Sequence, residues 1–264
     1  MPWIDLEGAA NARDLGGLPT EDGGKTVAGR LLRSDNLQEL TPADISKLTS
    51  EYGLSTVVDL RSTAELNSEG PAPMDGRASV EHRHHPVLPE EGLATDAVAD
   101  VLVTSRSERD RSRYPDNAVT GHYLGYLEDR PDQVVAALRS VARAPGAALV
   151  HCAAGKDRTG VVVALALSVA GVRPDAIVAD YAATGDRTEP LLARLRRSPT
   201  YSADINRRPA DSHKPQAATM AAFLTELDAR FGGAAAWLTA HGLSDDDLEL
   251  LRAKLRAPGR ADLQ

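Results

Sequence analysis

The chain has 264 residues, enough to bury a full hydrophobic core, and this length suits a single α/β catalytic domain over residues 1–264. Its 30 Lys and Arg against 38 Asp and Glu give a formal net charge of −8, which excludes a general binder of nucleic-acid polymers, since such proteins are basic. The single cysteine excludes an intramolecular disulfide and suits a reducing compartment.

Strand and helix patterns alternate along the chain, as a sheet flanked by helices requires. Strands are predicted at residues 29–34, 56–60, 80–87 and 147–150. A helix is predicted to begin after Thr41, because Pro42 suits a first helical turn. Other helices are predicted at 116–128, 131–143 and 161–172, from 174 onward, and at 215–231 and 244–255. The expected fold is therefore α/β with a helical C-terminal part.

Two charged segments stand apart from this pattern. Residues 89–115 are rich in Glu, Asp, Ser and Arg, and they are either a mobile helical lid, extending to about residue 130, or an ordinary solvated insertion. A second group is expected to be a solvated helix and turn: Arg194, Arg196, Arg197, Arg207 and Arg208.

Three histidines follow one another on the predicted strand 80–87. His82 and His84 share one face of that strand, and zinc accepts imidazole ligands. A closed site needs further ligands, however, and the chain has no second cysteine. We therefore predict no metal and no cofactor, and we expect these histidines and His85 near the sheet edge or the rim of the site.

The segment HCAAGKDRTG, residues 151–160, is the most informative in the chain. Cys152 stands six residues before Arg158, on a glycine-containing turn between a predicted strand and a predicted helix. Unpaired N–H groups at the start of a helix favour an anion, either a thiolate or a bound phosphate. Lys156 and Arg158 add positive charge nearby, so Cys152 is predicted to be a nucleophile at neutral pH.

The remaining residues of this loop match the needs of phosphoryl transfer. Ala153, Ala154 and Gly155 keep the loop backbone open to a phosphate. Arg158 can bind two phosphate oxygens and tighten on them in the transition state, and the Thr159 hydroxyl is expected to stabilise the sulfur when it leaves. The predicted reaction forms a phosphocysteine that water then hydrolyses.

Two other interpretations fit the loop less well. A lone cysteine is usually a small buried hydrophobe. A cysteine with only that role would not need the spacing that Cys152 keeps to Arg158 and Thr159. A nucleotide-binding loop ending in Gly-Lys-Ser/Thr needs a glycine where Val150 stands and a hydroxyl where Asp157 stands. No ATPase is therefore indicated.

The loop resembles the signature loop of cysteine-dependent protein tyrosine phosphatases, and GKDRTG is similar to their atypical bacterial group, of the mycobacterial tyrosine phosphatase B type. Other segments of the chain also resemble recurring segments of that group, in the same order: residues 11–17, 29–35, 58–62 and 177–181. The resemblance implies a central, mainly parallel sheet flanked by helices, with a helical lid or insertion. It also implies metal-independent hydrolysis with dual specificity, on phosphotyrosine, phosphoserine or phosphothreonine and phosphoinositides.

A leaving oxygen needs a proton, so a carboxylic acid is expected near it. The resemblance assigns a catalytic role to an aspartate at the position of Asp157, which makes it the leading candidate. The alternative for Asp157 is an ion pair with a loop arginine or a cap on the following helix. Glu90 and Glu91 are the other candidates for the acid, because they follow the predicted strand 80–87.

Further substrate-binding residues are implied by the resemblance. A lysine at the position of Lys156 favours substrates with more than one phosphate in phosphoinositide phosphatases, and the alternative is a solvated lysine. Arg13 and Asp35 are implied to line the site. For Arg13 a structural hydrogen-bonding role fits the sequence at least as well.

Function is open among three classes: a phosphatase of phosphorylated proteins or lipids, a phosphatase of a small metabolite such as a sugar phosphate or nucleotide, and a catalytically weak phosphate-binding module. Intact Cys152 and Arg158 argue against the third. A deep aromatic-lined pocket would favour phosphotyrosine, and a narrow polar pocket closed by residues 89–115 would favour a metabolite. Only two Phe, two Trp and six Tyr are present, which weakly favours the metabolite.

The first ten residues have neither a basic segment nor an apolar core, so no ordinary signal peptide is expected. The longest apolar stretch, residues 161–172, is far shorter than the ~20 residues of a membrane helix. We therefore expect a cytoplasmic protein without membrane insertion, with signal-independent secretion as the alternative. The sequence does not indicate the oligomeric state.

Overall fold

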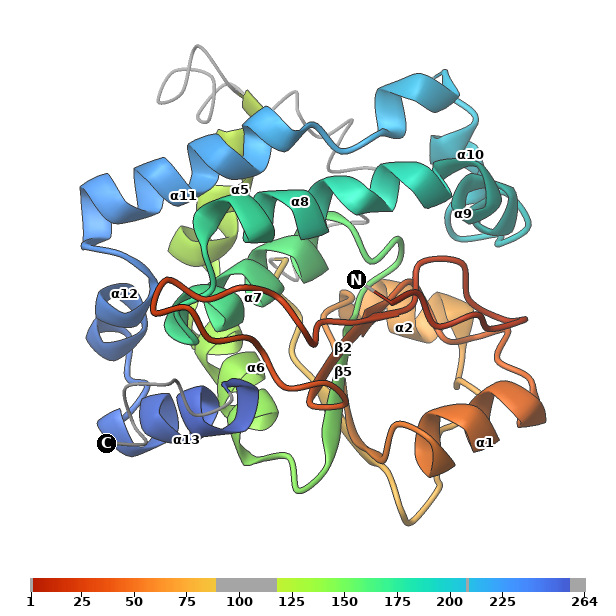
Figure 1. Ribbon diagram of the computed structural model, residues 1–264. Coiled ribbons are helices and arrows are strands. Elements are labelled where there is room, and N and C mark those ends of the chain that lie inside the picture. The colour runs from red at the N-terminus through yellow and green to blue at the C-terminus, as the bar shows by residue number, and fades with distance from the viewer. Residues whose placement is uncertain (1, 89–117, 208, 257–264) are drawn as a thin grey trace.

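The computed structural model describes residues 2–88, 118–207 and 209–256 (Figure 1). A five-stranded sheet lies at its centre, in the order β1-β2-β5-β3-β4. Its strands are β1 Arg13–Asp14, β2 Leu31–Ser34, β3 Leu54–Asp59, β4 Glu81–His84 and β5 Ala147–His151. Only β1 pairs antiparallel, with β2, so the sheet is mainly parallel, which confirms the predicted fold class.

Helices cover both faces of this sheet. Before β5 the described α-helices are α1 Pro42–Ser50, α2 Thr63–Glu69, α5 Ala118–Asp129 and α6 Pro131–Arg143. After β5 they are α7 Asp157–Val169, α8 Pro174–Ala183, α9 Thr188–Leu195, α10 Ser202–Ile205, α11 Ala217–Phe231, α12 Ala234–Ala240 and α13 Asp245–Leu255. Two short 3-10 helices, η2 Thr184–Arg187 and η3 Ala210–His213, flank α9 and α10. In Figure 1, α6 and α7 lie on one side of the sheet and α1 on the other.

The central strand β5 explains these two layers, because its side chains alternate between faces. Ala148 and Val150 belong to the larger core, with α5–α8 and α11–α13. Ala147 and Leu149 belong to the smaller core, which includes the α1 residues Ile45 and Leu48. β5 is thus buried on both faces, as a central parallel strand requires, and this places its carboxyl end in the interior.

Most predicted elements are confirmed, with shifts at the ends. The helix predicted at 161–172 is α7 Asp157–Val169, because Gly171 takes a φ of 75° and the N–H of Val172 bonds back to the Leu167 carbonyl. Thr41 caps α1 through a reciprocal bond pair with Asp44. Sequence analysis missed β1, α2, α10 and α12, and it expected the α9 residue Arg194 on a solvated helix.

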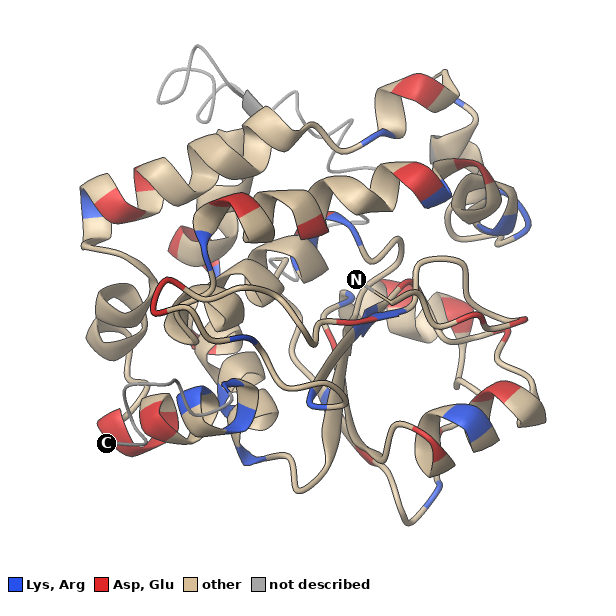
Figure 2. Cartoon of the chain, in the orientation of Figure 1, with Lys and Arg blue, Asp and Glu red and all other residues tan. Residues whose placement is uncertain are grey.

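Residues 89–117, most of the predicted lid, lie outside the described residues. The described part of that segment forms α5, and its Tyr123, Leu124 and Leu127 are buried in the larger core. Charges of both signs are mixed over the outer helices in Figure 2. Any positive site must therefore arise from local contacts.

Candidate active site

The predicted loop joins the carboxyl end of β5 to the first turn of α7. β5 ends at His151, α7 begins at Asp157, and Cys152 between them is fully buried. The Cys152 thiol thus lies where a central parallel strand meets a helix N-terminus, as predicted. This is the place where backbone N–H groups can stabilise an anion.

Gly155 is required by the shape of this loop. Its φ is 65°, a conformation that residues with a side chain rarely adopt. A Cβ at this position would also lie 2.3 Å from the Ser34 carbonyl oxygen. The loop can therefore pack against the end of β2 only with glycine here.

The loop carbonyls are held by side chains from the N-terminal part of the chain. Asn11 Nδ2 donates to the Ala154 and Gly155 carbonyls, at 2.9 and 3.2 Å. Arg33 Nη2 donates to the Gly155 carbonyl at 2.6 Å. Because N–H and C=O point in opposite directions across a trans peptide, the amides of Gly155 and Lys156 face away from these two side chains. That orientation suits an anion cradle.

A buried carboxylate connects two arginines of the segment that supports the loop. Asp180 on α8 binds Arg13 Nε at 2.8 Å and Arg33 Nη1 at 2.5 Å. Burial and the neighbouring charge of Arg33 lower the pKa of Arg13 to about 10. Arg13 also donates to Asn11 and Thr184 and is 0% exposed. These contacts fit a structural hydrogen-bonding role for Arg13 better than a place in the lining of the site.

The guanidinium of Arg158 is oriented by Glu65. Nη1 and Nη2 of Arg158 donate to the two carboxylate oxygens at 2.6 and 2.8 Å, and both side chains are 0% exposed. Burial opposes ionisation of Glu65, but the charge of Arg158 holds the pKa of that carboxyl below its usual 4.5. Sequence analysis missed Glu65.

A visible signal for Glu65 was present in the sequence. Ser62 and Glu65 form a capping box at the start of α2, in which the Ser62 N–H donates to Glu65 Oε2 at 2.7 Å. The same carboxylate therefore caps a helix and orients the loop arginine. Only the fold shows the second role.

Asp157, the predicted acid, is bound on both oxygens. Its Oδ1 accepts a hydrogen bond from the Tyr123 hydroxyl of α5, and its Oδ2 lies 3.5 Å from Lys156 Nζ. Lys156 Nζ also donates to the His213 carbonyl at 3.1 Å. Both Asp157 and Lys156 line a pocket beside the loop. Glu90 and Glu91 lie outside the described residues.

Asp35 holds the N-terminal segment against α9. Its carboxylate accepts from the N–H groups of Ala10 and Asn11, at 3.1 and 3.0 Å, and forms an ion pair with Arg194. Arg194 was expected to be solvated, and that expectation is wrong, because its side chain is only 10% exposed. The pair holds α9 next to the loop.

The Thr159 hydroxyl is buried on the first turn of α7. Its oxygen has no hydrogen-bond partner among the described residues. A buried hydroxyl without a partner costs free energy, so a ligand or an ionised sulfur would satisfy it. The role of Thr159 in stabilising the leaving sulfur stays a prediction.

The strand histidines have separate partners. His82 Nδ1 lies 3.0 Å from Asp75 Oδ1, His84 Nε2 lies 2.8 Å from the Arg61 carbonyl, and His85 Nε2 lies 2.9 Å from Ser140 Oγ. Among the residues with described coordinates, no three His, Cys, Asp or Glu are grouped to hold a metal ion.

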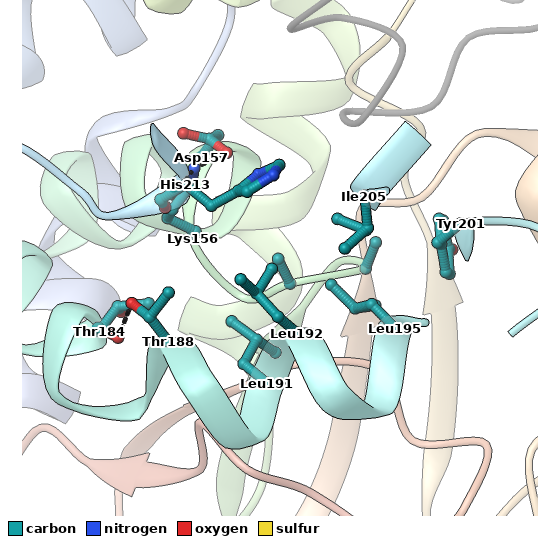
Figure 3. A pocket seen from close by; sticks show the side chains of 12 residues that line it. Lys156, Asp157, Thr184, Thr188, Leu191, Leu192, Leu195, Tyr201, Ile205 and His213 are labelled. Atoms are coloured by element: carbon teal, nitrogen blue, oxygen red, sulfur yellow. Dashed lines mark hydrogen bonds and ion pairs between the residues drawn. The ribbon is translucent and has the colours of Figure 1, made fainter. Parts of the chain in front are cut away.

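The loop forms one wall of a pocket of about 510 Å³, including its open mouth. Its other walls are mostly apolar and come from α9 and the segment that follows it: Leu191, Leu192, Leu195, Tyr201 and Ile205. Figure 3 shows Lys156, Asp157 and His213 at one end and Tyr201 at the other. Sequence analysis missed this wall, because it expected the helix that carries Arg194 to be solvated.

Within the described residues, every helix is too short or too polar to cross a membrane.

Comparisons with known proteins agree with this geometry. Residues 4–257 match the model of the tyrosine phosphatase family. The triple specificity protein phosphatase PtpB of Mycobacterium tuberculosis is 32% identical over 208 residues, 74% of each chain. A Cupriavidus necator protein provisionally named a tyrosine-protein phosphatase is 34% identical over 194 residues, 70% of this chain and 66% of its own. A tyrosine-protein phosphatase of Nostoc commune is 27% identical over 239 residues, 88% of this chain and 76% of its own.

Proposed function

Since the chain belongs to the tyrosine phosphatase family and is a cysteine-dependent phosphatase, we propose that Cys152 is its nucleophile and phosphotyrosine its preferred substrate. The position of Cys152 between β5 and α7 supports the first assignment. The apolar pocket beside the loop supports the second.

In the first chemical step, the Cys152 sulfur forms a bond to phosphorus as the bond from phosphorus to the leaving oxygen breaks. The loop amides and the fork of Arg158 hold the three remaining phosphate oxygens. Glu65 supports this role, because its two hydrogen bonds fix the plane of the guanidinium before substrate arrives. In the second step water attacks phosphorus, and Thr159 stabilises the departing thiolate.

Asp157 is proposed as the general acid of the first step and the general base of the second. It lines the pocket, and its side chain is 14% exposed, so a substrate can reach it. A poor leaving group depends on protonation more than a good one does. Asp157→Asn should therefore slow an alkyl phosphate far more than p-nitrophenyl phosphate, and equal losses on both substrates would remove Asp157 from this role.

The preference for phosphotyrosine rests on the pocket walls. Leu191, Leu192 and Leu195 present apolar surface beside Ala153 and Ala154 of the loop. An aromatic ring gains free energy by burial against such surface, whereas a sugar or a phosphoserine side chain gains little. The apolar walls therefore argue against the small polar metabolite.

A second substrate class has its own support. Lys156 lines the same pocket and brings a cation that a second phosphate group would bind, as in a phosphoinositide. The relative named a triple specificity phosphatase makes a broader range worth testing, including phosphoserine and phosphothreonine.

A substrate panel tests these proposals. Phosphotyrosine peptides, phosphoserine peptides, inositol phosphates, nucleotides and sugar phosphates would be compared by kcat/KM. Phosphotyrosine peptides are expected to lead. A higher kcat/KM for a sugar phosphate or nucleotide would reject the proposed preference and favour the metabolite.

A further inference from the structure

A chain of two buried tyrosine hydroxyls ends on the carboxylate of Asp157. The Tyr123 hydroxyl donates to Asp157 Oδ1, and the Tyr181 hydroxyl lies 2.6 Å from the Tyr123 hydroxyl. Each phenol has one proton to donate. Since Tyr123 gives its proton to Asp157, Tyr181 must donate to Tyr123, so the chain runs in one direction.

Packing fixes the rings of both tyrosines. Tyr123 on α5 is 0% exposed and packs edge to face on Tyr181 and Phe223, with centroid distances of 6.1 and 6.2 Å. The Tyr181 ring lies against Gly160 on the first turn of α7, where an added Cβ would come within 3.0 Å of Cδ2. The glycine after Thr159 thus lets the Tyr181 ring approach the turn that carries Asp157.

We propose that Tyr123 is a positioning residue for the general acid: its hydroxyl, held by Tyr181, binds Oδ1 of Asp157, so that Oδ2 carries the proton to the leaving oxygen. This inference rests on the proposed role of Asp157. It adds two residues, on α5 and α8, that act through Asp157.

The proton balance of the step follows from this arrangement. As the sulfur bonds to phosphorus, the electron pair of the breaking bond goes to the leaving oxygen, which takes the proton from Oδ2. Asp157 becomes a carboxylate, while Tyr123 keeps its own proton and goes on donating to Oδ1. A hydrogen bond to a charged acceptor is stronger than one to a neutral acceptor, so Tyr123 favours release of the proton.

The ionisation of the two phenols agrees with this role. Burial raises the pKa of Tyr123 well above 10, and the Asp157 charge acts in the same direction. Burial likewise raises the pKa of Tyr181. Both hydroxyls therefore remain donors at every pH at which the enzyme would be assayed.

Other groups also face Asp157 and stay in place when Tyr123 is changed. Lys156 Nζ lies 3.5 Å from Oδ2, and its partner His213 lines the same pocket. Arg33 reaches the backbone at this point through the Lys156 carbonyl, at 3.5 Å. A change confined to the hydroxyl of Tyr123 therefore isolates its effect on Asp157.

The test is the pH dependence of kcat/KM with phenyl phosphate, which has a poor leaving group. With such a substrate the alkaline limb of the profile reports the need for a general acid. Tyr123→Phe removes one donor to the carboxylate and should move that alkaline limb up by about one pH unit. Tyr181→Phe should move it in the same direction by less.

Tyr126→Phe is the matched control. Tyr126 lies on the same helix, is 2% exposed and stacks on Tyr123 at 6.0 Å, but its hydroxyl bonds His122 Nε2. Its alkaline limb should not move. A thermal melt of each variant reports any loss of stability, which by itself does not shift a pH profile.

Asp157→Asn separates failure of this inference from failure of the proposed acid. If Asp157→Asn abolishes the alkaline limb and Tyr123→Phe leaves it in place, Asp157 is the acid and the positioning role is wrong. If the limb persists in Asp157→Asn, the proposed role of Asp157 is wrong and the inference falls with it. An upward shift in Tyr123→Phe, with a limb that depends on Asp157, supports both.

Discussion

Glu65 and Arg158 form a two-fold hydrogen-bonded ion pair, at 2.6 and 2.8 Å, in a region closed to water. A buried pair of this kind is costly to break, because the remaining charge is left without a partner. Here the pair joins α2, on which the sequence shows only a capping box, to the loop that carries Cys152. The orientation of the phosphate-binding arginine therefore depends on a residue 93 positions away in the chain.

Glu65→Gln is expected to lower kcat/KM about 100-fold, because a misplaced guanidinium no longer fits the transition state. Breaking the buried pair should also cost about 3 kcal/mol or more of unfolding free energy. Steady-state kinetics and urea unfolding measure the two effects.

Ser62→Ala is the control for this variant. It removes the hydroxyl that accepts from the Glu65 N–H at 3.2 Å and that also hydrogen-bonds the Glu65 carboxylate, and so weakens the cap of α2 by about 1 kcal/mol, but it keeps the charge of Glu65 and both hydrogen bonds from Arg158. Its kcat/KM should stay within about threefold of the unmodified enzyme. Equal activity losses in both variants would mean that α2, and not the ion pair, sustains catalysis.

Cys152→Ser is expected to abolish turnover and retain binding of inorganic phosphate. The hydroxyl is a far weaker nucleophile than a thiolate, while the loop amides and Arg158 are unchanged. Phosphate release assays and calorimetric titration measure the two properties. Substantial residual turnover would contradict the assignment of Cys152.

Leu192→Ala is expected to raise KM for a phosphotyrosine peptide about tenfold, because the ring loses apolar surface worth about 1.4 kcal/mol. KM for a phosphoserine peptide should change less than threefold. Leu48→Ala on α1 is the control, since Leu48 is also buried but lies in the smaller core and does not line the pocket. If KM rises equally for both peptides in Leu192→Ala, the pocket wall does not discriminate between an aromatic ring and a serine side chain.

Stability is expected to decrease as the pH falls below about 6.5. Burial lowers the pKa of His151 below its usual 6.5, so the unfolded chain takes up a proton in this range that the folded chain does not. The stability due to neutral His151 is therefore present above pH 6.5 and lost below it.

The carboxylates add a second loss at lower pH. Burial opposes their ionisation, yet Arg158 lowers the pKa of Glu65 below 4.5, and Arg33 and Arg13 lower that of Asp180 below 3.8. Their contribution is present above these ordinary values and is lost as the pH falls below them and through the lowered pKa values of the folded protein. Thermal melts at pH 7.5, 5.5 and about 2.5 measure both losses, and His151→Gln should flatten the first. A melting temperature constant from pH 7.5 to 5.5 would contradict the role of His151.

The sequence alone determined the loop, its chemistry and most of the sheet. Cys152, Arg158 and Thr159 lie within one short segment, residues 151–160, so the covalent chain sets their spacing. Short apolar runs between turns predict buried strands from local sequence alone. The family match confirms the resemblance that these residues carried.

Only the tertiary structure decided which distant residues support that loop. Glu65, Tyr123 and Tyr181 reach it from α2, α5 and α8, and contacts between segments far apart in the chain leave no periodic signal in one sequence. Arg194 illustrates the same limit. Its sequence neighbourhood is that of a solvated helix, yet it is buried because Asp35, at the end of β2, supplies the opposite charge.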